Sequence, residues 1–360
     1  MPRTASDAFR HFAAKHPLGY LYLEITRRCN LKCVYCGSSC GPKTLPEEMP
    51  VARWVAVLEQ IAADFDSKKI MLAITGGEPL LKPDVFDLFG AAKRLGFPFG
   101  MVTNATLIDD KMAERLAGCG IGSISLSFDA PPEVNDSLRG KGISERVARA
   151  AKALQDAGYR GKLEIMTTFT KPVTPHLDAL RKYISQLRVG LWRIVPVMPI
   201  GQAATRPDLL PDCEDFKTLL KFVETARKDG LRPAPELGEE GFLGDPYETE
   251  KSVRPYKFLC RAGLTIAGIS YDGKIGACPE LTPAFTQGHV DRDRFKDVWE
   301  TRYEVFRKRD WTRVGQCHSC RSFDRCLGGS MHLYEKPGDA TCRCLFEMIG
   351  GDRTTAGRTS

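Results

Sequence analysis

Gly19-Tyr-Leu-Tyr-Leu-Glu-Ile-Thr26 is followed closely by Cys29-Asn-Leu-Lys-Cys33-Val-Tyr-Cys36, and these two segments decide how the rest of the chain is interpreted. The alternating first segment predicts a β-strand, so the cysteines are expected on the loop that leaves its C-terminal end. Three thiolates can hold a metal cluster and leave one coordination position empty. The spacing alone also allows a zinc site.

Strands and helices are expected to alternate from this point to about residue 200. After a helix that begins near Val51, a buried strand at 69–75 ends in Gly76-Gly77-Glu78-Pro79. Four further helix and strand pairs follow, with helices at 83–95, 109–118, 144–157 and 175–188 and strands at 97–103, 122–128, 162–169 and 191–197. Ser144 is expected to cap the third of these helices and Gly158 to end it. Six such strands predict an α/β fold, a partial (β/α)6 TIM-like barrel.

The carboxyl ends of parallel strands meet at one rim, where ligands bind. Polar residues stand at these ends after the second to fifth strands, and all are expected to face one cavity. They are Gly76, Gly77 and Glu78, then Thr103 and Asn104, then Ser127 and Asp129, then Thr168.

The remaining segments are less regular. Residues 1–17 are interpreted as an N-terminal extension, 18–200 as the barrel, 201–257 as one amphipathic helix with a linker, and 351–360 as a flexible tail. Residues 258–350 contain short strands at best but hold seven of the thirteen cysteines. A small domain with so weak a core is expected to need metals or cross-links to stay folded.

The overall composition narrows the classes of function. The chain has 360 residues, 42% of them hydrophobic, and a net charge of +7 without a long Lys/Arg block. We therefore expect neither nucleic-acid binding nor a membrane segment, which would need about 20 consecutive apolar residues. The N-terminus lacks the apolar region of a signal peptide, so the expected location is the cytoplasm, where cysteines are more often metal ligands than disulfides.

The cysteine spacing, with Tyr35 before the last cysteine, and the Gly76-Gly77-Glu78 turn resemble the radical S-adenosylmethionine (radical SAM) superfamily. The resemblance implies that Cys29, Cys33 and Cys36 bind a [4Fe–4S] cluster whose fourth iron binds SAM, and it makes zinc the weaker reading. In that family reductive cleavage of SAM gives a 5′-deoxyadenosyl radical that abstracts a substrate hydrogen. The expected SAM-binding residues are Tyr35, Gly76, Gly77, Glu78, Asn104, Ser127, Arg139 and Thr168, with Ser125 replacing Ser127 if the strand register shifts by two.

The C-terminal cysteines resemble the SPASM domain or its shortened Twitch form, which implies one or two auxiliary [4Fe–4S] clusters. The expected ligands are Cys260, Cys278, Cys317, Cys320, Cys326, Cys342 and Cys344. Ser330 stands where the family pattern has a further cysteine, whereas Cys342 and Cys344 offer one more late ligand than expected. Both the number of clusters and the choice between these two cysteines stay open, and His332 is a conceivable ligand.

The two resemblances do not name the reaction. An oxidative outcome needs a base, for which Glu280 is the first candidate and Asp129 the second. An epimerisation needs a hydrogen donor, typically a thiol outside any cluster, and Cys213 or Cys40 could serve.

We expect an oxidoreductase or maturase that acts on a ribosomally made peptide. The alternative is a dehydrogenase or epimerase that tailors a sugar or aminoglycoside-type natural product. Fewer than 30 residues precede Cys29, so a peptide substrate would call for a separate leader-peptide-binding protein, and a flavodoxin- or ferredoxin-type reductant is expected. A nonenzymatic electron-transfer protein would not need Gly76-Gly77-Glu78.

Overall fold

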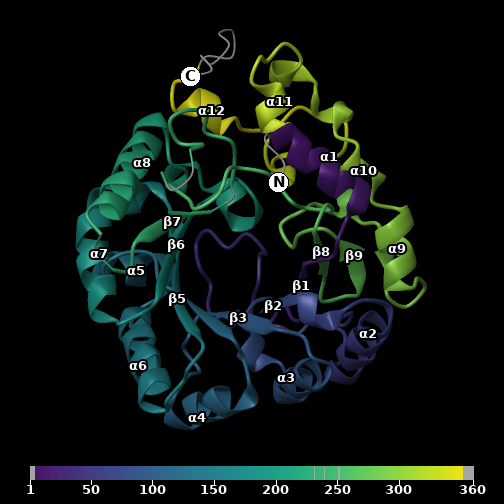
Figure 1. The fold of residues 1–360 in the computed structure, drawn as a ribbon. Coiled ribbons are helices and arrows are strands. Elements are labelled where there is room, and N and C mark those ends of the chain that lie inside the picture. The colour runs from purple at the N-terminus through teal and green to yellow at the C-terminus, as the bar shows by residue number, and fades with distance from the viewer. Residues whose placement is uncertain (1–4, 231, 239, 250–251, 352–360) are drawn as a thin grey trace.

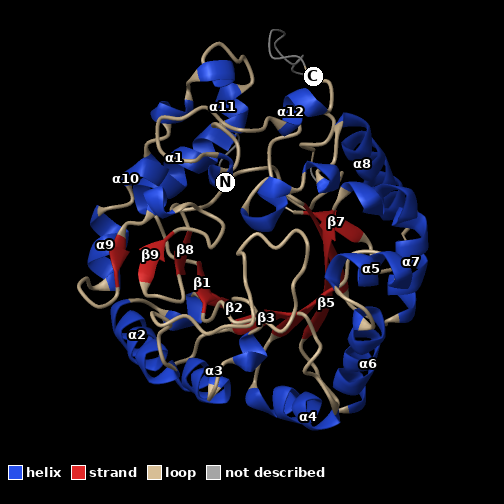
Figure 2. Ribbon diagram, turned by 180° about the vertical axis from the view of Figure 1, so that it is seen from behind, coloured by secondary structure: helices blue, strands red, loops and turns tan. Residues whose placement is uncertain are grey.

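The computed structural model describes residues 5–230, 232–238, 240–249 and 252–351. Six parallel strands follow one another in the order of the chain, and the helices between them lie outside the curved sheet (Figures 1 and 2). The strands are β1 (Tyr20–Glu24), β2 (Met71–Thr75), β3 (Phe99–Thr103), β4 (Ser123–Ser127), β5 (Lys162–Phe169) and β6 (Leu191–Pro196). The main outer helices are α2 (Val51–Asp64), α3 (Val85–Arg94), α4 (Asp110–Cys119), α6 (Ile143–Asp156) and α7 (Leu177–Gln186). The predicted partial barrel is confirmed.

The two faces of the sheet differ in chemistry. In β1, Leu21 and Leu23 are fully buried, and alternation directs Tyr20 and Tyr22 to the opposite face, inside the arc. Burial raises the pKa of both tyrosines, and the guanidinium of Arg193 on the distant strand β6 opposes this shift, so the three side chains share the interior of the arc. The interior therefore carries polar groups, and the hydrophobic core lies between the strands and the outer helices.

The sheet continues beyond the predicted six strands. A short strand β7 (Pro235–Leu237) pairs in parallel with β6, and β8 (Ile266–Ile269) pairs in parallel with β1. Beyond β8 lie β9 (Lys274–Gly276) and β10 (Gly288–His289), both antiparallel. The segment 201–257 thus holds a strand besides its predicted helix, α8 (Cys213–Lys228), and the cysteine-rich segment extends the barrel sheet directly.

The stretch between β4 and α6 differs from its prediction. A helix that was not predicted, α5 (Pro132–Arg139), occupies it. Ser144 is not the N-cap of α6, because Gly142 holds that position and the carboxylate of Asp136 accepts hydrogen bonds from the backbone N–H groups of Gly142 and Ser144, at 2.5 and 2.8 Å. Gly158 follows α6 with φ +71°, as expected of a helix-ending glycine.

The N-terminal helix α1 (Ala5–Lys15) lies against the C-terminal segment (Figure 1). Ser6 donates a hydrogen bond to the Asp324 carbonyl, and the guanidinium of Arg309 stands 5.1 Å from the ring centre of Phe9. The segment's own helices are short: α9 (Phe295–Thr301), α10 (Glu304–Arg307), α11 (Phe323–Cys326) and α12 (Leu345–Met348). The N-terminal extension therefore contains a helix that packs against the C-terminal segment. Residues 352–360 of the predicted tail lie outside the described residues.

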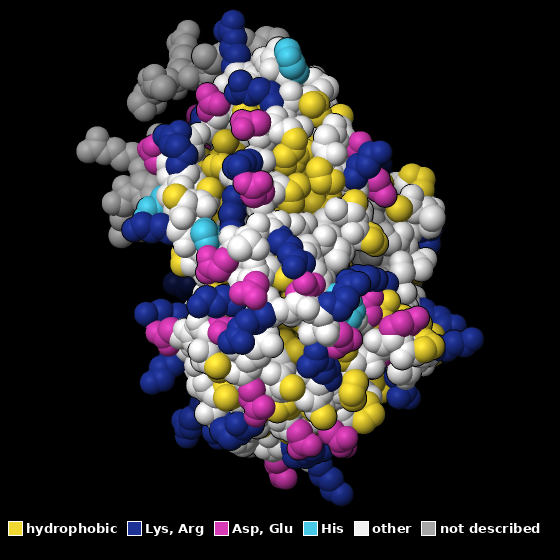
Figure 3. Space-filling model, turned by 90° about the vertical axis from the view of Figure 1, so that its right-hand side faces the viewer, with side chains coloured by type: hydrophobic (Ala, Val, Ile, Leu, Met, Phe, Trp, Pro, Cys, Tyr) yellow, Lys and Arg dark blue, Asp and Glu magenta, His cyan; other side chains and the backbone are white. Residues whose placement is uncertain are grey.

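Charges of both signs are interspersed over the face drawn in Figure 3, in keeping with a net charge spread along the chain. None of the described helices combines the length and the apolar character that crossing a bilayer requires.

Candidate active site

The cysteine loop lies within the arc of strands, where Figure 1 shows the purple segment that follows β1. Its base is closed by two backbone hydrogen bonds, from Cys29 N–H to the Gly41 carbonyl at 2.7 Å and from Gly41 N–H to the Arg27 carbonyl at 3.2 Å. At its far end the Cys36 carbonyl accepts a hydrogen bond from the Gln202 N–H at 2.9 Å. The protein backbone therefore shapes this loop at both ends.

The three thiols of this loop are close together and withdrawn from solvent. The pKa of the Cys33 thiol is raised to about 11, chiefly by burial and in smaller part by Asp129, Cys36 and Cys29, while Arg139 opposes the shift. Burial also raises the pKa of Cys29, whereas a hydrogen bond from the Cys40 thiol lowers that of Cys36 to about 6. Buried neighbouring thiolates are stable only beside strong positive charge, so this donor set fits three irons of a cluster.

The two glycines after β2 permit a close approach of backbone to backbone. A Cβ on Gly76 would lie 2.3 Å from the Thr26 carbonyl oxygen, and a Cβ on Gly77 would lie 2.3 Å from that of Arg28 and 2.9 Å from Cys29 Cβ. The Gly77 N–H donates to Thr26 at 2.8 Å. The glycines thus fix the turn against the cysteine loop, and their predicted approach to SAM stays a prediction.

Glu78 is completely buried at the same turn, and burial raises its pKa to about 7. Its carboxylate accepts hydrogen bonds from Leu80 N–H at 3.1 Å, Thr103 Oγ1 at 2.8 Å and Asn104 N–H at 2.8 Å. The amide of Asn104 in turn donates to Asn30 Oδ1 at 2.9 Å and lies 3.7 Å from Cys29 Sγ. Glu78 therefore holds the end of β3 beside the cluster loop, and direct binding of SAM by Glu78 or Asn104 stays a prediction.

Asp129, after β4, connects three predicted site residues. Its carboxylate forms an ion pair with Arg139 of α5 at 2.6 Å, accepts a hydrogen bond from the Tyr35 hydroxyl and accepts another from the Thr168 N–H at 2.7 Å. Both Asp129 and Arg139 are buried, and the pairing holds the pKa of Arg139 well above its usual range. With both oxygens engaged, Asp129 is a structural hub, which argues against its use as a base.

The two serines of β4 differ in position. Ser127, at the strand's end, is partly exposed, as a ligand-binding residue at the rim requires. Ser125 is buried deeper, and its hydroxyl donates to Glu164 Oε2 at 2.7 Å, while Arg193 Nε lies 3.2 Å from Glu164 Oε1. This contact favours Ser127 over Ser125 as the predicted SAM-binding residue.

Four cysteines of the C-terminal segment line one small pocket. They are Cys317, Cys320, Cys326 and Cys344, with Phe242, Phe323 and Phe346 among the surrounding walls. Burial raises the pKa of Cys326 well above its usual range, and the other three thiols raise it further. Four thiols in an apolar pocket fit the complete cysteine ligation of one [4Fe–4S] cluster.

Cys342 does not line this pocket, which favours Cys344 as the late ligand here, and ligation by Cys342 stays a prediction. Its backbone N–H donates to the Leu333 carbonyl at 2.9 Å and its side chain is exposed. Cys344 occupies the N-cap position of α12, where the chain turns toward the pocket.

Cys260 and Cys278 form a separate group. Desolvation raises the pKa of Cys278 strongly, and Glu280, Cys260 and Glu240 raise it further, so these groups are neighbours. Ser330, where a cysteine was expected, is buried, and a serine hydroxyl does not replace a thiolate as an iron ligand. The pairing of Cys260 and Cys278 alone does not fit a cluster bound by four cysteines.

The other predicted catalytic residues are dispersed. Cys213 is an exposed thiol at the start of α8, outside the strand ends that form the site, which argues against hydrogen donation within a site that excludes water. Cys40 is hydrogen bonded to Cys36 beside the cluster loop. Glu280 lies 3.9 Å from Nδ1 of His332, whose pKa is lowered by burial.

A pocket of about 190 Å³ lies between the rim and the C-terminal segment. Glu24 and Arg27 line it from the end of β1, and Asp272, Lys274 and Cys278 line it from around β9. Burial raises the pKa of Glu24 to about 7. Glu24 and Arg27 were not predicted from the sequence as site residues. An acidic residue at the end of a buried strand is a signal from which Glu24 could have been predicted.

Comparisons with known proteins agree with these two regions. The model for the radical SAM superfamily matches residues 23–184, and the SPASM model, described as an iron–sulfur cluster-binding domain, matches residues 260–321.

Three relatives are similar over most of their length. The mycofactocin maturase MftC of Mycolicibacterium smegmatis is 30% identical, covering 86% of this chain and 76% of that protein. The AdoMet-dependent heme synthase of Oleidesulfovibrio alaskensis is 25% identical, covering 94% and 89%. The PqqA peptide cyclase of Gluconobacter oxydans is 26% identical, covering 92% and 87%.

The fold also matches a solved structure. SuiB of Streptococcus suis, bound to the precursor peptide SuiA, superposes with a TM-score of 0.72 and 21% identity, over 93% of this chain and 78% of that chain.

Proposed function

Because this chain belongs to the radical SAM superfamily and carries a SPASM iron–sulfur domain, we propose that it modifies a ribosomally synthesised peptide by abstracting a hydrogen atom from it. Its cofactors are SAM and iron–sulfur clusters. The observation that carries the chemistry is the group of three close thiols, Cys29, Cys33 and Cys36, enclosed by strand ends that the protein itself holds in place.

The cluster and SAM supply, when bound, the 5′-deoxyadenosyl radical. The protein residues then have two tasks, which are to position the substrate and to keep other hydrogen donors away from the radical. Tyr35, Arg139 and Thr168 are joined through Asp129, so one buried carboxylate positions three of the residues assigned to SAM binding. Ser127 and Asn104 would complete that side of the site.

The pocket beside Glu24 and Arg27 is the place where a substrate would meet both regions. It presents charges of both signs and the polar groups of Asp272 and Lys274, which suits the amide groups and side chains of a peptide better than an apolar ligand. The names of two relatives, a maturase and a peptide cyclase, point in the same direction. The heme synthase relative provides the competing substrate class.

The chain would also need partners. A flavodoxin- or ferredoxin-type protein would deliver the electron, and a separate leader-peptide-binding protein would present the substrate. Whether the outcome is a crosslink, a dehydrogenation or an epimerisation depends on the residues that face the substrate.

Isotope transfer tests the proposal. Anaerobically reconstituted protein receives reductant, SAM and, in deuterated form, any short precursor peptide whose reading frame is found beside its gene. The expected result is deuterium in 5′-deoxyadenosine together with a change in peptide mass. Parallel reactions contain a deuterated porphyrin precursor or a deuterated aminosugar. Deuterium transfer from one of these, and none from the peptide, would contradict the assignment.

A further inference from the structure

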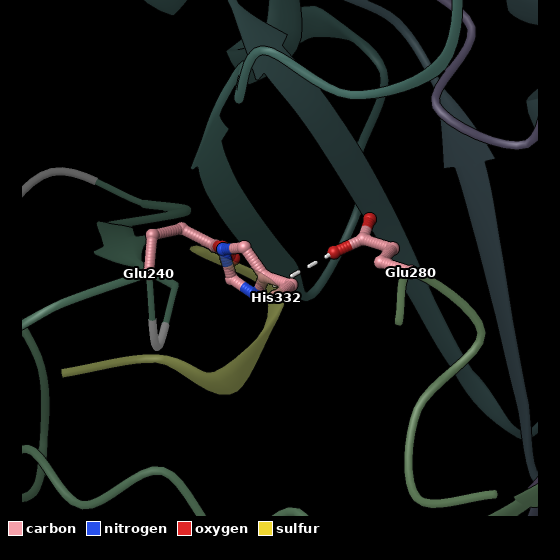
Figure 4. A group of neighbouring side chains, drawn as sticks. All are labelled: Glu240, Glu280 and His332. Carbon is pink, nitrogen blue, oxygen red and sulfur yellow. Dashed lines mark ion pairs between the residues drawn. The ribbon is translucent and has the colours of Figure 1, made fainter. Parts of the chain in front are cut away.

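Three side chains from separate segments meet beside the Cys260 and Cys278 pair. Glu240 follows β7, Glu280 follows Cys278, and His332 belongs to the short 3-10 helix Met331–Leu333. One nitrogen or oxygen atom from each of the three lies within 4.8 Å of those from the other two. Figure 4 shows the imidazole of His332 between the two carboxylates.

The histidine is buried without a complete set of hydrogen bonds. Its side chain is 8% exposed, and its Nε2 atom makes no hydrogen bond within the described part of the chain. That atom lies 3.4 Å from Oε2 of Glu240, and Nδ1 lies 3.9 Å from Oε2 of Glu280. Leaving a buried polar atom without a hydrogen bond is unfavourable. Together with two neighbouring carboxylates, the free nitrogen indicates a cation.

We propose that Glu240, Glu280 and His332 bind a single divalent transition-metal cation. Two carboxylates and one imidazole suit Zn²⁺, Mn²⁺ or Co²⁺, whereas Ca²⁺ and Mg²⁺ prefer oxygen ligands alone. Three protein ligands leave coordination positions open. Glu280 is 43% exposed while Glu240 is 14% exposed, so the open positions face the side of Glu280.

The thiols nearby do not offer an equivalent explanation. Four cysteine ligands are the usual requirement of a [4Fe–4S] cluster, and Cys260 and Cys278 are two, with Ser330 in place of a third. The cation site would therefore replace a second auxiliary cluster instead of supplementing it. It also changes the expected role of Glu280, since a carboxylate bound to a cation is a poor base.

The distances require an adjustment of the side chains. Metal–ligand bonds of about 2.0–2.2 Å in tetrahedral or octahedral geometry place neighbouring ligand atoms about 3.0–3.6 Å apart. A separation of up to 4.8 Å must therefore shrink by about 1 Å or more. The partly exposed side chain of Glu280 can supply that movement.

Such a cation would act as a Lewis acid toward a carbonyl or carboxylate group of a bound molecule. Glu280 stands beside Cys278, which lines the pocket that also contains Glu24 and Arg27. The proposal does not depend on whether the substrate is a peptide.

Co²⁺ is the probe for the test. The holoprotein is reconstituted anaerobically, stripped of loosely bound metal and titrated with Co²⁺, and the bound metal is counted by mass spectrometry. One Co²⁺ per chain is expected, with nitrogen and oxygen neighbours and no sulfur neighbour in X-ray absorption at the cobalt edge, which the iron–sulfur clusters do not obscure. His332→Ala and the isosteric Glu280→Gln should each weaken binding by about 100-fold or more.

The controls separate this site from the thiols and from misfolding. His11→Ala and Glu335→Gln remove the same kinds of group from exposed positions and should leave Co²⁺ binding unchanged. Iron content, which should stay at the wild-type value in His332→Ala and Glu280→Gln, checks that those variants fold. Undiminished Co²⁺ binding in both variants, or binding that disappears in Cys278→Ser and shows a cobalt–sulfur distance, would overturn the proposal.

Discussion

The three-thiol loop at the rim and the four-thiol pocket of the C-terminal segment hold cysteines in different ways. The loop after β1 is fixed by backbone hydrogen bonds at Cys29, Gly41 and Cys36 and by the ends of neighbouring strands. The pocket is built from short helices, and three of its cysteines come from a stretch of ten residues, 317–326. The rim is organised by the fold, whereas the pocket's own secondary structure is too slight to hold four thiols without a metal.

The number of thiols separates the functions of the two sites. Three thiols leave one iron of a cluster free to bind a small molecule, and they lie at the rim where strand ends converge. Four thiols would satisfy a cluster completely and would enclose it among Phe242, Phe323 and Phe346, an environment that suits electron transfer. We therefore expect that substituting a cysteine at the rim abolishes SAM cleavage, whereas substituting a cysteine of the pocket releases iron and weakens the C-terminal segment.

The largest effect is expected from Cys344→Ser. Removing a ligand from the four-thiol pocket should release about four irons per chain and make the C-terminal segment sensitive to proteolysis, because metal binding contributes to its folding. Anaerobic iron and sulfide analysis with limited proteolysis measures both. Cys342→Ser is the matched control, since its thiol is exposed. Equal loss of iron in the two variants would contradict the assignment of Cys344.

The second effect concerns the carboxylate hub of the rim. Asp129→Asn leaves the buried guanidinium of Arg139 without its ion pair, so the free energy of unfolding should fall by about 3–5 kcal/mol. Chemical denaturation followed by tryptophan fluorescence measures the change. Asp156→Asn removes half of an exposed ion pair with Lys152 and should change stability by less than about 1 kcal/mol. A similarly small change in the free energy of unfolding in both variants would show that the hydrogen bonds and ion pair of Asp129 do not stabilise the rim.

Glu24 supplies a pH-dependent test of the rim. Its pKa is about 7 in the folded protein because it is buried, against 4.5 ordinarily. Below about pH 4.5 it is protonated in both states; as the pH rises toward 7 the unfolded chain ionises first, and stability is lost. By about pH 8 the loss should approach about 3 kcal/mol. Glu24→Gln should flatten this part of the curve of unfolding free energy against pH, and an unchanged curve would argue against the shift.

The smallest effect is expected from Gly201→Ala. Gly201 has φ +55°, and a Cβ there would lie 2.1 Å from the Gly37 carbonyl oxygen and 2.5 Å from that of Cys36. We expect a loss of about 1–3 kcal/mol together with slower SAM cleavage, because the cluster loop must shift. Gly158→Ala is the control, since φ is +71° there and nothing lies within 4 Å of the added Cβ. It should lower stability by backbone strain while SAM cleavage stays unchanged.

Most of the barrel could be predicted from local patterns. The strand before Cys29 and the Gly76-Gly77-Glu78 turn were located because alternation, buried runs and glycine pairs are local signals. Strand β7 was missed because it has three residues and begins with Pro235. Helix α5 was missed because its polar sequence resembles a loop, although Pro132 at its first position is a helix-start signal.

The residues of the candidate site could be predicted where they are close together in the sequence. They could not be predicted where they meet only through tertiary packing. Cys29, Cys33 and Cys36 are linked by spacing alone. Glu240 and His332 are 92 positions apart, and no periodicity connects them. The hydrogen bonds of Asp129 and the choice between Cys342 and Cys344 likewise depend on how distant segments pack.

The release of 5′-deoxyadenosine from SAM tests the central claim most directly. Reconstituted wild-type protein, Cys33→Ala and Cys344→Ser are supplied with SAM and a strong chemical reductant, and the nucleoside is counted per chain. The account predicts turnover in the wild type, none above background in Cys33→Ala, and retained cleavage in Cys344→Ser. Undiminished release from Cys33→Ala would contradict the assignment of the rim as the site of SAM cleavage.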